Sequence, residues 1–128
     1  KEKRYKEQLD FTLIEAQKQL NDYFSGERKE FDLALKINGT EFQKDVWQEL
    51  MKIPYGNTVS YQDIAIAIGN NNAYRAVGNA NNKNQIPIII PCHRVVGSNG
   101  LGGYGAGTSR KKWLLEHEKN NLKGDNHE

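Results

Sequence analysis

The sequence contains one cysteine, one methionine and three prolines among 128 residues. No apolar run approaches the roughly 18 residues that a membrane span requires. The single cysteine, Cys92, excludes an internal disulfide framework and any zinc site built on two or more cysteines. With no signal-like apolar segment, a reducing cytosolic compartment is expected. Because the only methionine is Met51, we expect that Lys1 is not a natural start and that the chain is part of a longer one.

The composition is typical of a globular chain that forms one domain, or one domain and a fragment of another. Hydrophobic residues make up 37% and charged residues 27%, and the net charge is +2. The charge is unevenly distributed, because residues 53–115 carry six lysines and arginines against one acid, Asp63. A basic block of this kind favours an anionic partner, most often nucleic acid. The alternative is a solvated basic surface with no partner.

The first 38 residues predict one helix and one strand. Apolar residues recur at helical spacing from Leu9 to Phe24, and Gly26 follows as a stop signal. Residues 31–37 alternate between apolar and polar, which is typical of a half-buried strand. One helix and one strand cannot form a sheet alone, so this segment is interpreted as the remnant of a larger α/β unit.

Beyond Gly39 the pattern predicts short helices. Thr40, in a Thr-x-x-Gln capping box, predicts a helix that is stopped by Pro54. Ser60 predicts the cap of a second helix over 61–68, and a third is expected over 73–81. Two short helices with a tight turn between them, the second carrying a base near its start, fit a helix-turn-helix.

Cys92 stands at the end of an apolar run, 86–91, which prolines favour as an extended segment. His93 and Arg94 follow it, and the glycine-rich loop 97–107 comes next. Nearby cations or a basic imidazole lower a thiol pKa, and the thiolate is the nucleophile. This setting favours a reactive cysteine, whereas the alternative is a small buried hydrophobic residue.

A catalytic imidazole needs an acceptor that orients it, and Glu118, on a helix predicted over 109–119, is a candidate for His93. The alternative for Glu118 is an exposed glutamate near a helix end. His117 is interpreted as a packing residue and His127 as part of a polar tail. No metal site or cofactor is expected.

Several motifs, in this order along the chain, resemble one family: the methylated-DNA–protein-cysteine methyltransferases, or O6-alkylguanine-DNA alkyltransferases. The similarity covers about residues 17–118. The motifs are Gly39-Thr40-x-Phe42-Gln43-x-x-Val46-Trp47, Ile53-Pro54-Tyr55-Gly56, Ser60-Tyr61, Arg75-Ala76-Val77-Gly78, Pro91-Cys92-His93-Arg94-Val95-Val96 and Trp113-Leu114-Leu115-x-His117-Glu118.

The resemblance implies a single-turnover DNA-repair enzyme that acts as a monomer. It would bind duplex DNA containing O6-alkylguanine from the minor groove, flip the base and take the alkyl group onto a cysteine, with O4-alkylthymine as a further substrate. The implied fold is a mainly α, winged helix-turn-helix-like catalytic domain, 39–128, after a truncated ribonuclease-H-like α/β domain, 1–38. The implied location is the cytoplasm and nucleoid of a prokaryote or the nucleus of a eukaryote, with no membrane partner.

The resemblance also implies roles for individual residues. Cys92 is the acceptor, His93 its base through a water, and Glu118 the residue that orients His93. Asn84 braces the turn before the cysteine, and Tyr61 aids departure of the base. DNA contacts fall to Ser60, Tyr61, Arg75, Ala76 and Asn81, with Arg75 filling the vacated stack. Tyr104, Gly105 and the Val95 carbonyl line the base pocket.

Two positions depart from the family pattern. Gly105 stands where some members have serine, so only a backbone amide can donate there, and Asn81 replaces an apolar pocket residue. Two other functions stay open. One is a damage-binding protein without chemistry, like the alkyltransferase-like proteins, which replace the acceptor cysteine. The other is a Cys–His hydrolase that turns over repeatedly.

Overall fold

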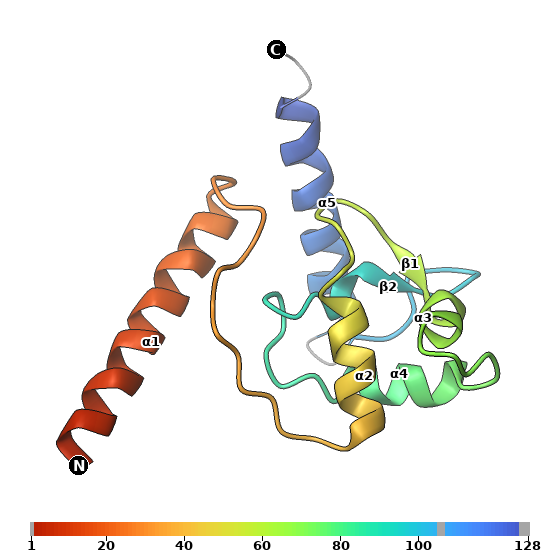
Figure 1. Cartoon of the computed structure of the whole chain (residues 1–128). Helices are drawn as coiled ribbons and strands as arrows, with labels where there is room; N and C mark the ends of the chain where they lie inside the picture. Colours follow the sequence, from red (N-terminus) through yellow and green to blue (C-terminus); the bar gives the residue numbers. More distant parts are fainter. Residues whose placement is uncertain (1, 105–106, 126–128) are drawn as a thin grey trace. The chain divides into compact units, whose positions relative to one another are not determined.

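The computed structural model describes residues 2–104 and 107–125, and it divides into two compact units, Lys1–Lys36 and Ile37–Glu128. The protein is mostly helical with one small sheet (Figure 1). None of the described helices is both long and apolar enough to cross a membrane. The elements in chain order are α1 (Glu2–Phe24), α2 (Glu41–Leu50), β1 (Val59–Ser60), α3 (Tyr61–Ala67), α4 (Tyr74–Asn82), the 3₁₀ helix η1 (Cys92–Arg94), β2 (Val95–Val96) and α5 (Thr108–Asp125).

The first unit confirms the predicted helix but not the predicted strand. α1 ends at Phe24, and Gly26 adopts a left-handed φ of 86° that turns the chain. Residues 31–37 form no strand. The side chain of Gln19 takes the place of a strand partner, because its amide accepts from the Asp32 N–H and donates to the Asp32 carbonyl, both at 2.9 Å. The alternating polarity of residues 31–37 therefore does not indicate pairing with another strand.

In the second unit, α2 begins at the capping box that the sequence predicts. Thr40 Oγ1 accepts from the Gln43 N–H at 3.1 Å, and Gln43 Oε1 accepts from the Thr40 N–H at 3.0 Å. The helix buries Val46, Trp47 and Leu50. The Trp47 indole donates to the Ala80 carbonyl at 2.9 Å, so a hydrogen bond joins α2 to α4 in addition to their packing.

α3 and α4 pack against each other and against α2. A second capping box begins α3, where Ser60 and Asp63 exchange hydrogen bonds at 2.9 and 3.0 Å. Gly69, with a φ of 78°, ends this segment and lets the chain turn toward α4. Both helices lie within one residue of their predicted bounds.

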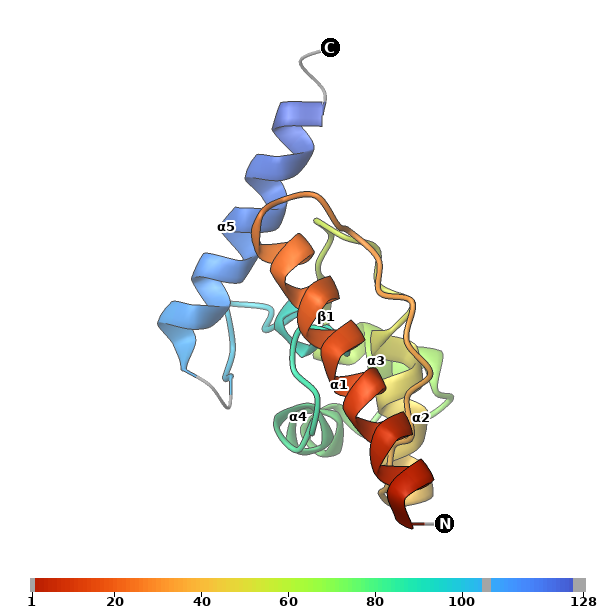
Figure 2. The same ribbon diagram turned by 90° about the vertical axis from the view of Figure 1, so that its left-hand side faces the viewer.

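The only sheet among the described residues has two short parallel strands that the sequence did not predict. β1 pairs with β2 in the register Val59 to Val95. β1 runs directly into α3, and β2 directly follows η1. In both views of the ribbon, the chain from the end of α4 returns to β2 through a long loop (Figures 1 and 2). The sheet therefore ties the start of α3 to the turn that carries Cys92.

Candidate active site

The chain reaches Cys92 through a braced turn rather than the fully extended run that the sequence predicts. Asn84 Nδ2 donates to the Ile90 carbonyl at 2.8 Å, and Asn84 Oδ1 accepts from the Ile86 N–H at 3.0 Å. The Ile90 N–H also donates to the Ile86 carbonyl at 3.0 Å. Inside this turn Ile88 has a φ of 77°, which a β-branched residue rarely adopts. The Asn84 hydrogen bonds hold that conformation in place.

Cys92 begins η1 and is buried, with 4% of its surface exposed. Burial raises the pKa of its thiol. Hydrogen bonds from the Asn84 and Tyr104 side chains and the charge of Lys111 oppose this effect without cancelling it. The thiol pKa is thus raised overall, where the sequence led us to expect a lowered value. Cys92 is a thiol at neutral pH and needs a base to become a nucleophile.

His93, the next residue in sequence, belongs to a buried ion cluster. His93 Nε2 lies 2.6 Å from Glu118 Oε2. Arg94 binds the same carboxylate in a bidentate manner, with Nε 2.9 Å from Oε1 and Nη2 2.9 Å from Oε2. The Gly56 N–H also donates to Glu118 Oε1, at 2.9 Å. Glu118 on α5 therefore fixes the two residues that follow Cys92.

The charges in this cluster determine where the proton of His93 lies. Burial tends to raise the pKa of Glu118, but the hydrogen bonds from His93 and Arg94 outweigh it and hold the pKa at about 2. Burial lowers the pKa of His93, against the effect of Glu118. A neutral His93 facing an ionised carboxylate carries its hydrogen on Nε2. Its other nitrogen, Nδ1, is buried and has no partner among the described residues, so it is open to accept a proton.

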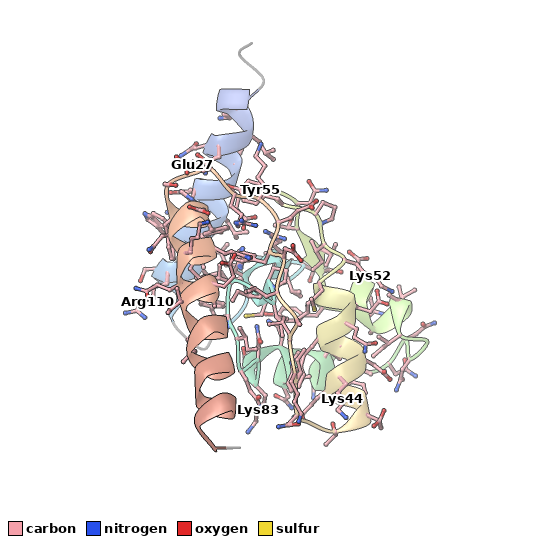
Figure 3. The ribbon with its side chains drawn as sticks, turned by 60° about the vertical axis from the view of Figure 1, so that its left-hand side comes forward. Glu27, Lys44, Lys52, Tyr55, Lys83 and Arg110 are labelled. Carbon is pink, nitrogen blue, oxygen red and sulfur yellow. The ribbon has the colours of Figure 1, made fainter. Side chains whose placement is uncertain are left out.

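The sequence analysis considered Arg94 only as a cation near Cys92, whereas the structure places it against Glu118. It is buried, and besides Glu118 its Nη1 donates to the Ile53 carbonyl at 2.8 Å. Its guanidinium also lies 5.5 Å from the ring centroid of Tyr55. Tyr55, which is labelled in Figure 3, accepts a hydrogen bond from Asn121 of α5 at 2.9 Å. In the sequence, only the position of Arg94 directly after Cys92 and His93 could have indicated that it belongs to the site. The burial of Arg94 depends on Glu118 and Ile53, which are distant in sequence.

Two tyrosines approach the cysteine from other elements. Tyr61, the first residue of α3, donates through its hydroxyl to the Gly103 carbonyl at 3.4 Å. Burial raises its pKa, and the nearby Cys92 adds to the rise. Burial also raises the pKa of Tyr104, whose hydroxyl hydrogen bonds the Cys92 sulfur. Both hydroxyls thus stay protonated and serve as donors near the thiol.

Lys111 on α5 is a second buried cation that the sequence analysis did not single out. Its ammonium donates to the Val95 carbonyl at 2.6 Å, to the Gly103 carbonyl at 3.1 Å and to the Leu101 carbonyl. The Val95 carbonyl, which the resemblance places in the base pocket, is therefore already a hydrogen-bond acceptor. Gly105 lies outside the described residues.

The residues expected to contact DNA do not all lie on one surface. Arg75 and Ala76 are exposed in the first turn of α4. The Ser60 hydroxyl caps α3. Asn81 is buried, with 1% of its surface exposed, and its Nδ2 donates to the Cys92 carbonyl at 3.2 Å. Asn81 lies on the buried face of α4 and supports the turn that carries Cys92.

Besides His93, the sequence contains His117 and His127. The His117 ring stacks on Trp113 with centroids 4.7 Å apart, as expected of a packing residue, and His127 lies outside the described residues. The described part of the chain contains no cluster of three or more His, Cys, Asp or Glu residues that could hold a metal ion. Lys83 at the end of α4 and Arg110 in the first turn of α5 are exposed bases at the surface of this unit (Figure 3).

Comparisons with known proteins agree on one family. Residues 41–120 match the family model described as 6-O-methylguanine DNA methyltransferase, DNA binding domain. A methylated-DNA–protein-cysteine methyltransferase of Methanosarcina barkeri is 57% identical over 110 residues, which are 85% of this chain and 70% of that protein. The constitutive enzyme of that name from Bacillus subtilis is 54% identical over 84% of this chain and 66% of its own length.

Solved structures are similar to the fold as well. Mycobacterium tuberculosis OGT in complex with DNA matches with a TM-score of 0.81 and 55% identity, over 83% of this chain and 65% of that one. S. pombe Atl1, in complex with damaged DNA containing O6-carboxymethylguanine, matches with a TM-score of 0.56 and 33% identity, over 64% of this chain and 79% of that one. The chain thus spans about two thirds of the length of the methyltransferases. With a family model matched over 80 of its residues and relatives above half identity, the chain belongs to the methylated-DNA–protein-cysteine methyltransferases.

Proposed function

We propose that this protein repairs DNA by transferring a methyl or larger alkyl group from the O6 of guanine to Cys92 in a single turnover. The observation that carries the proposal is the buried series Cys92, His93, Glu118, in which the imidazole keeps its open nitrogen, Nδ1, while Nε2 is held by the carboxylate. Residues 39–128 would form the domain that both binds DNA and transfers the group. The match to OGT bound to DNA supports both parts of this proposal.

Activation of the thiol begins at His93. Its Nδ1 takes the Cys92 proton through a water, and Glu118 stabilises the resulting imidazolium by charge and by the hydrogen bond at 2.6 Å. The thiolate receives hydrogen bonds from Asn84 and Tyr104. The low pKa of Glu118 supports this role, because the carboxylate stays ionised while His93 changes charge.

The transfer itself is a direct displacement at the alkyl carbon. A bond forms between Cys92 sulfur and that carbon while the bond from the carbon to guanine O6 breaks, and the electron pair stays with the base. The protonated Tyr61 hydroxyl stabilises the negative charge that develops there. The base then takes a proton from solvent, and His93 releases the one it accepted. The thioether cannot be reversed by these groups, so each molecule acts once.

DNA engagement is assigned to α3 and α4 as a helix-turn-helix that enters the minor groove. The target base must leave the stack, which costs a few kcal/mol. The exposed guanidinium of Arg75 at the start of α4 can occupy the space that the base leaves. Its charge also suits a phosphate-rich partner. O4-alkylthymine presents the same bond type and is proposed as a second substrate.

The test is the intact mass of the protein after incubation with excess duplex DNA that contains O6-methylguanine, followed by peptide mapping. We expect a gain of one methyl group on Cys92 that stops at one equivalent. Tight binding without a mass change would support a damage sensor instead, and repeated turnover of an ester or amide substrate would support a hydrolase. Unmodified duplex of the same sequence is the control.

The role of Arg75 gives a separate prediction. Arg75→Ala should slow methyl transfer from duplex DNA by roughly 10- to 100-fold, the scale expected for a few kcal/mol of base extrusion. It should leave the reaction with free O6-benzylguanine within about twofold, since the free base needs no extrusion. The measurement is the single-turnover rate on both substrates. Lys83→Ala, an exposed base at the other end of α4, is the matched control and should not separate the two rates. Equal slowing on both substrates by Arg75→Ala would remove the base-flipping role.

A further inference from the structure

The buried ammonium of Lys111 has no role in the reaction described above. Its side chain is fully buried, although a lysine is almost never buried without partners. An ammonium has three N–H donors, and here three carbonyls accept them, those of Val95, Leu101 and Gly103. No donor is left for a substrate. Lys111 therefore acts on the protein itself.

The three carbonyls belong to different parts of the site. Val95 begins β2, directly after the turn that carries Cys92, whereas Leu101 and Gly103 lie in the glycine-rich loop that leads to Tyr104. Glycine-rich backbone has little conformational preference of its own, so external contacts must fix its path. The Lys111 ammonium is one such contact, because it joins the loop to β2 at a single point.

The same cation lies close to the groups that handle charge. Its Nζ is 5.9 Å from the ring centroid of Tyr61, whose hydroxyl also donates to the Gly103 carbonyl. Its positive charge stabilises the Cys92 thiolate and opposes the effect of burial on that thiol. The pKa of Lys111 is lowered to about 8 by burial, so the side chain is still mostly charged at neutral pH.

We infer that Lys111 is a positioning residue for the transfer reaction: its ammonium holds the segment from Leu101 to Gly103 so that the next residue, Tyr104, reaches the Cys92 sulfur, and its charge favours the thiolate. The inference rests on the proposed function. A displacement of about 1 Å in a positioned donor can slow a reaction by two orders of magnitude, so loss of this anchor has a measurable cost.

The first experiment measures the reactivity of the Cys92 thiol and does not require methyl transfer. Alkylation of Cys92 by iodoacetamide is followed by intact mass at about pH 7, where Lys111 is still mostly charged, and the rate reports the fraction of Cys92 that is thiolate. Lys111→Met, which keeps the length but removes the charge and all donors, should slow this alkylation several-fold, because the thiolate loses a stabilising charge. Lys112→Met, at the exposed neighbouring position, should leave it unchanged.

The second experiment measures single-turnover methyl transfer in the same variants. Lys111→Met should be slower by roughly 10- to 100-fold, while Lys112→Met stays within about twofold of the wild type. A folded Lys111→Met protein with the wild-type alkylation rate and the wild-type transfer rate would overturn the inference.

Lys111→Arg tests the positioning role separately and can be used if Lys111→Met does not fold. Its guanidinium keeps the charge, but a planar fork cannot direct three donors at these three carbonyls. We expect the rate of Cys92 alkylation to stay near that of the wild type while transfer falls at least about tenfold. Wild-type transfer in Lys111→Arg would refute the positioning role. If the unsubstituted protein transfers no methyl group but Lys111→Met still slows alkylation of Cys92, the proposed function fails and the charge effect on Cys92 stands.

Discussion

Substitution of Cys92 by serine is expected to abolish methyl transfer while leaving DNA affinity within about twofold of that of the unsubstituted protein. A serine hydroxyl is a far weaker acid than a thiol, so His93 cannot produce the required nucleophile from it at neutral pH. Cys92 is buried, and Arg75, the base proposed to enter the duplex, is exposed on α4, so binding does not depend on the sulfur. The measurements are intact mass for transfer and fluorescence anisotropy for binding.

Cys92→Ala is the companion variant, because it also removes the hydroxyl that could disturb the buried turn. Both variants should bind O6-methylguanine DNA tightly and reach no covalent product, however long the incubation. Loss of DNA affinity in proportion to loss of transfer, in both variants, would show that the thiol and the binding surface are not separate features.

The second large effect is expected for Glu118→Gln. The carboxamide has nearly the same shape, but it cannot satisfy the buried guanidinium of Arg94 in a bidentate manner or stabilise a charged His93. Removing one partner of a buried ion pair costs roughly 3–5 kcal/mol, because the remaining charge is left uncompensated. We expect a loss of that size in the free energy of unfolding in urea. Transfer should slow by at least about a hundredfold, the scale of an orienting carboxylate in such a series.

The same carboxylate predicts a pH dependence of stability. The pKa of Glu118 is about 2 in the folded protein, against 4.5 for an unperturbed glutamate. A carboxyl whose pKa is depressed on folding contributes stability that is fully present above its unfolded pKa and is lost as the pH falls through its folded pKa. The free energy of unfolding should therefore decline between about pH 4.5 and pH 2, and Glu118→Gln should flatten that decline.

Glu116→Gln is the matched control for both Glu118 measurements, since residue 116 lies on the same helix with its side chain exposed. Its stability, pH profile and transfer rate should stay close to those of the unsubstituted protein. A Glu118→Gln protein as stable as Glu116→Gln would mean that the buried cluster contributes little to the fold.

Features set by neighbouring residues could be predicted from the sequence. The capping boxes at Thr40 and Ser60 need only side chains three residues apart, and both are present. The strand predicted over 31–37 was wrong, because alternation reports which side chains face solvent but not whether a partner strand exists. Likewise, the short β1–β2 pair joins residues 36 positions apart and carries no signal within either segment.

The site could be predicted only as far as its motif extends. Cys92, His93 and Glu118 were selected by residue type, and the structure brings them together. The 3₁₀ helix at Cys92 depends on the Asn84 brace, which is a tertiary arrangement. The burial of Arg94 and Lys111 could not be predicted, because a basic side chain is usually exposed to solvent. Only the fold brings a carboxylate to Arg94 and backbone carbonyls to Lys111.

The burial of Cys92 has a consequence for the lifetime of the molecule before it meets a lesion. Under the proposed function one reaction consumes the protein, so Cys92 must not be lost to peroxides or soluble electrophiles, which attack the thiolate of accessible cysteines. Cys92 exposes 4% of its surface, and its raised pKa keeps it in the unreactive thiol form. Adventitious oxidation should therefore be slow. Under the proposed function, molecules that have not yet reacted therefore keep an intact Cys92 until a damaged base reaches it.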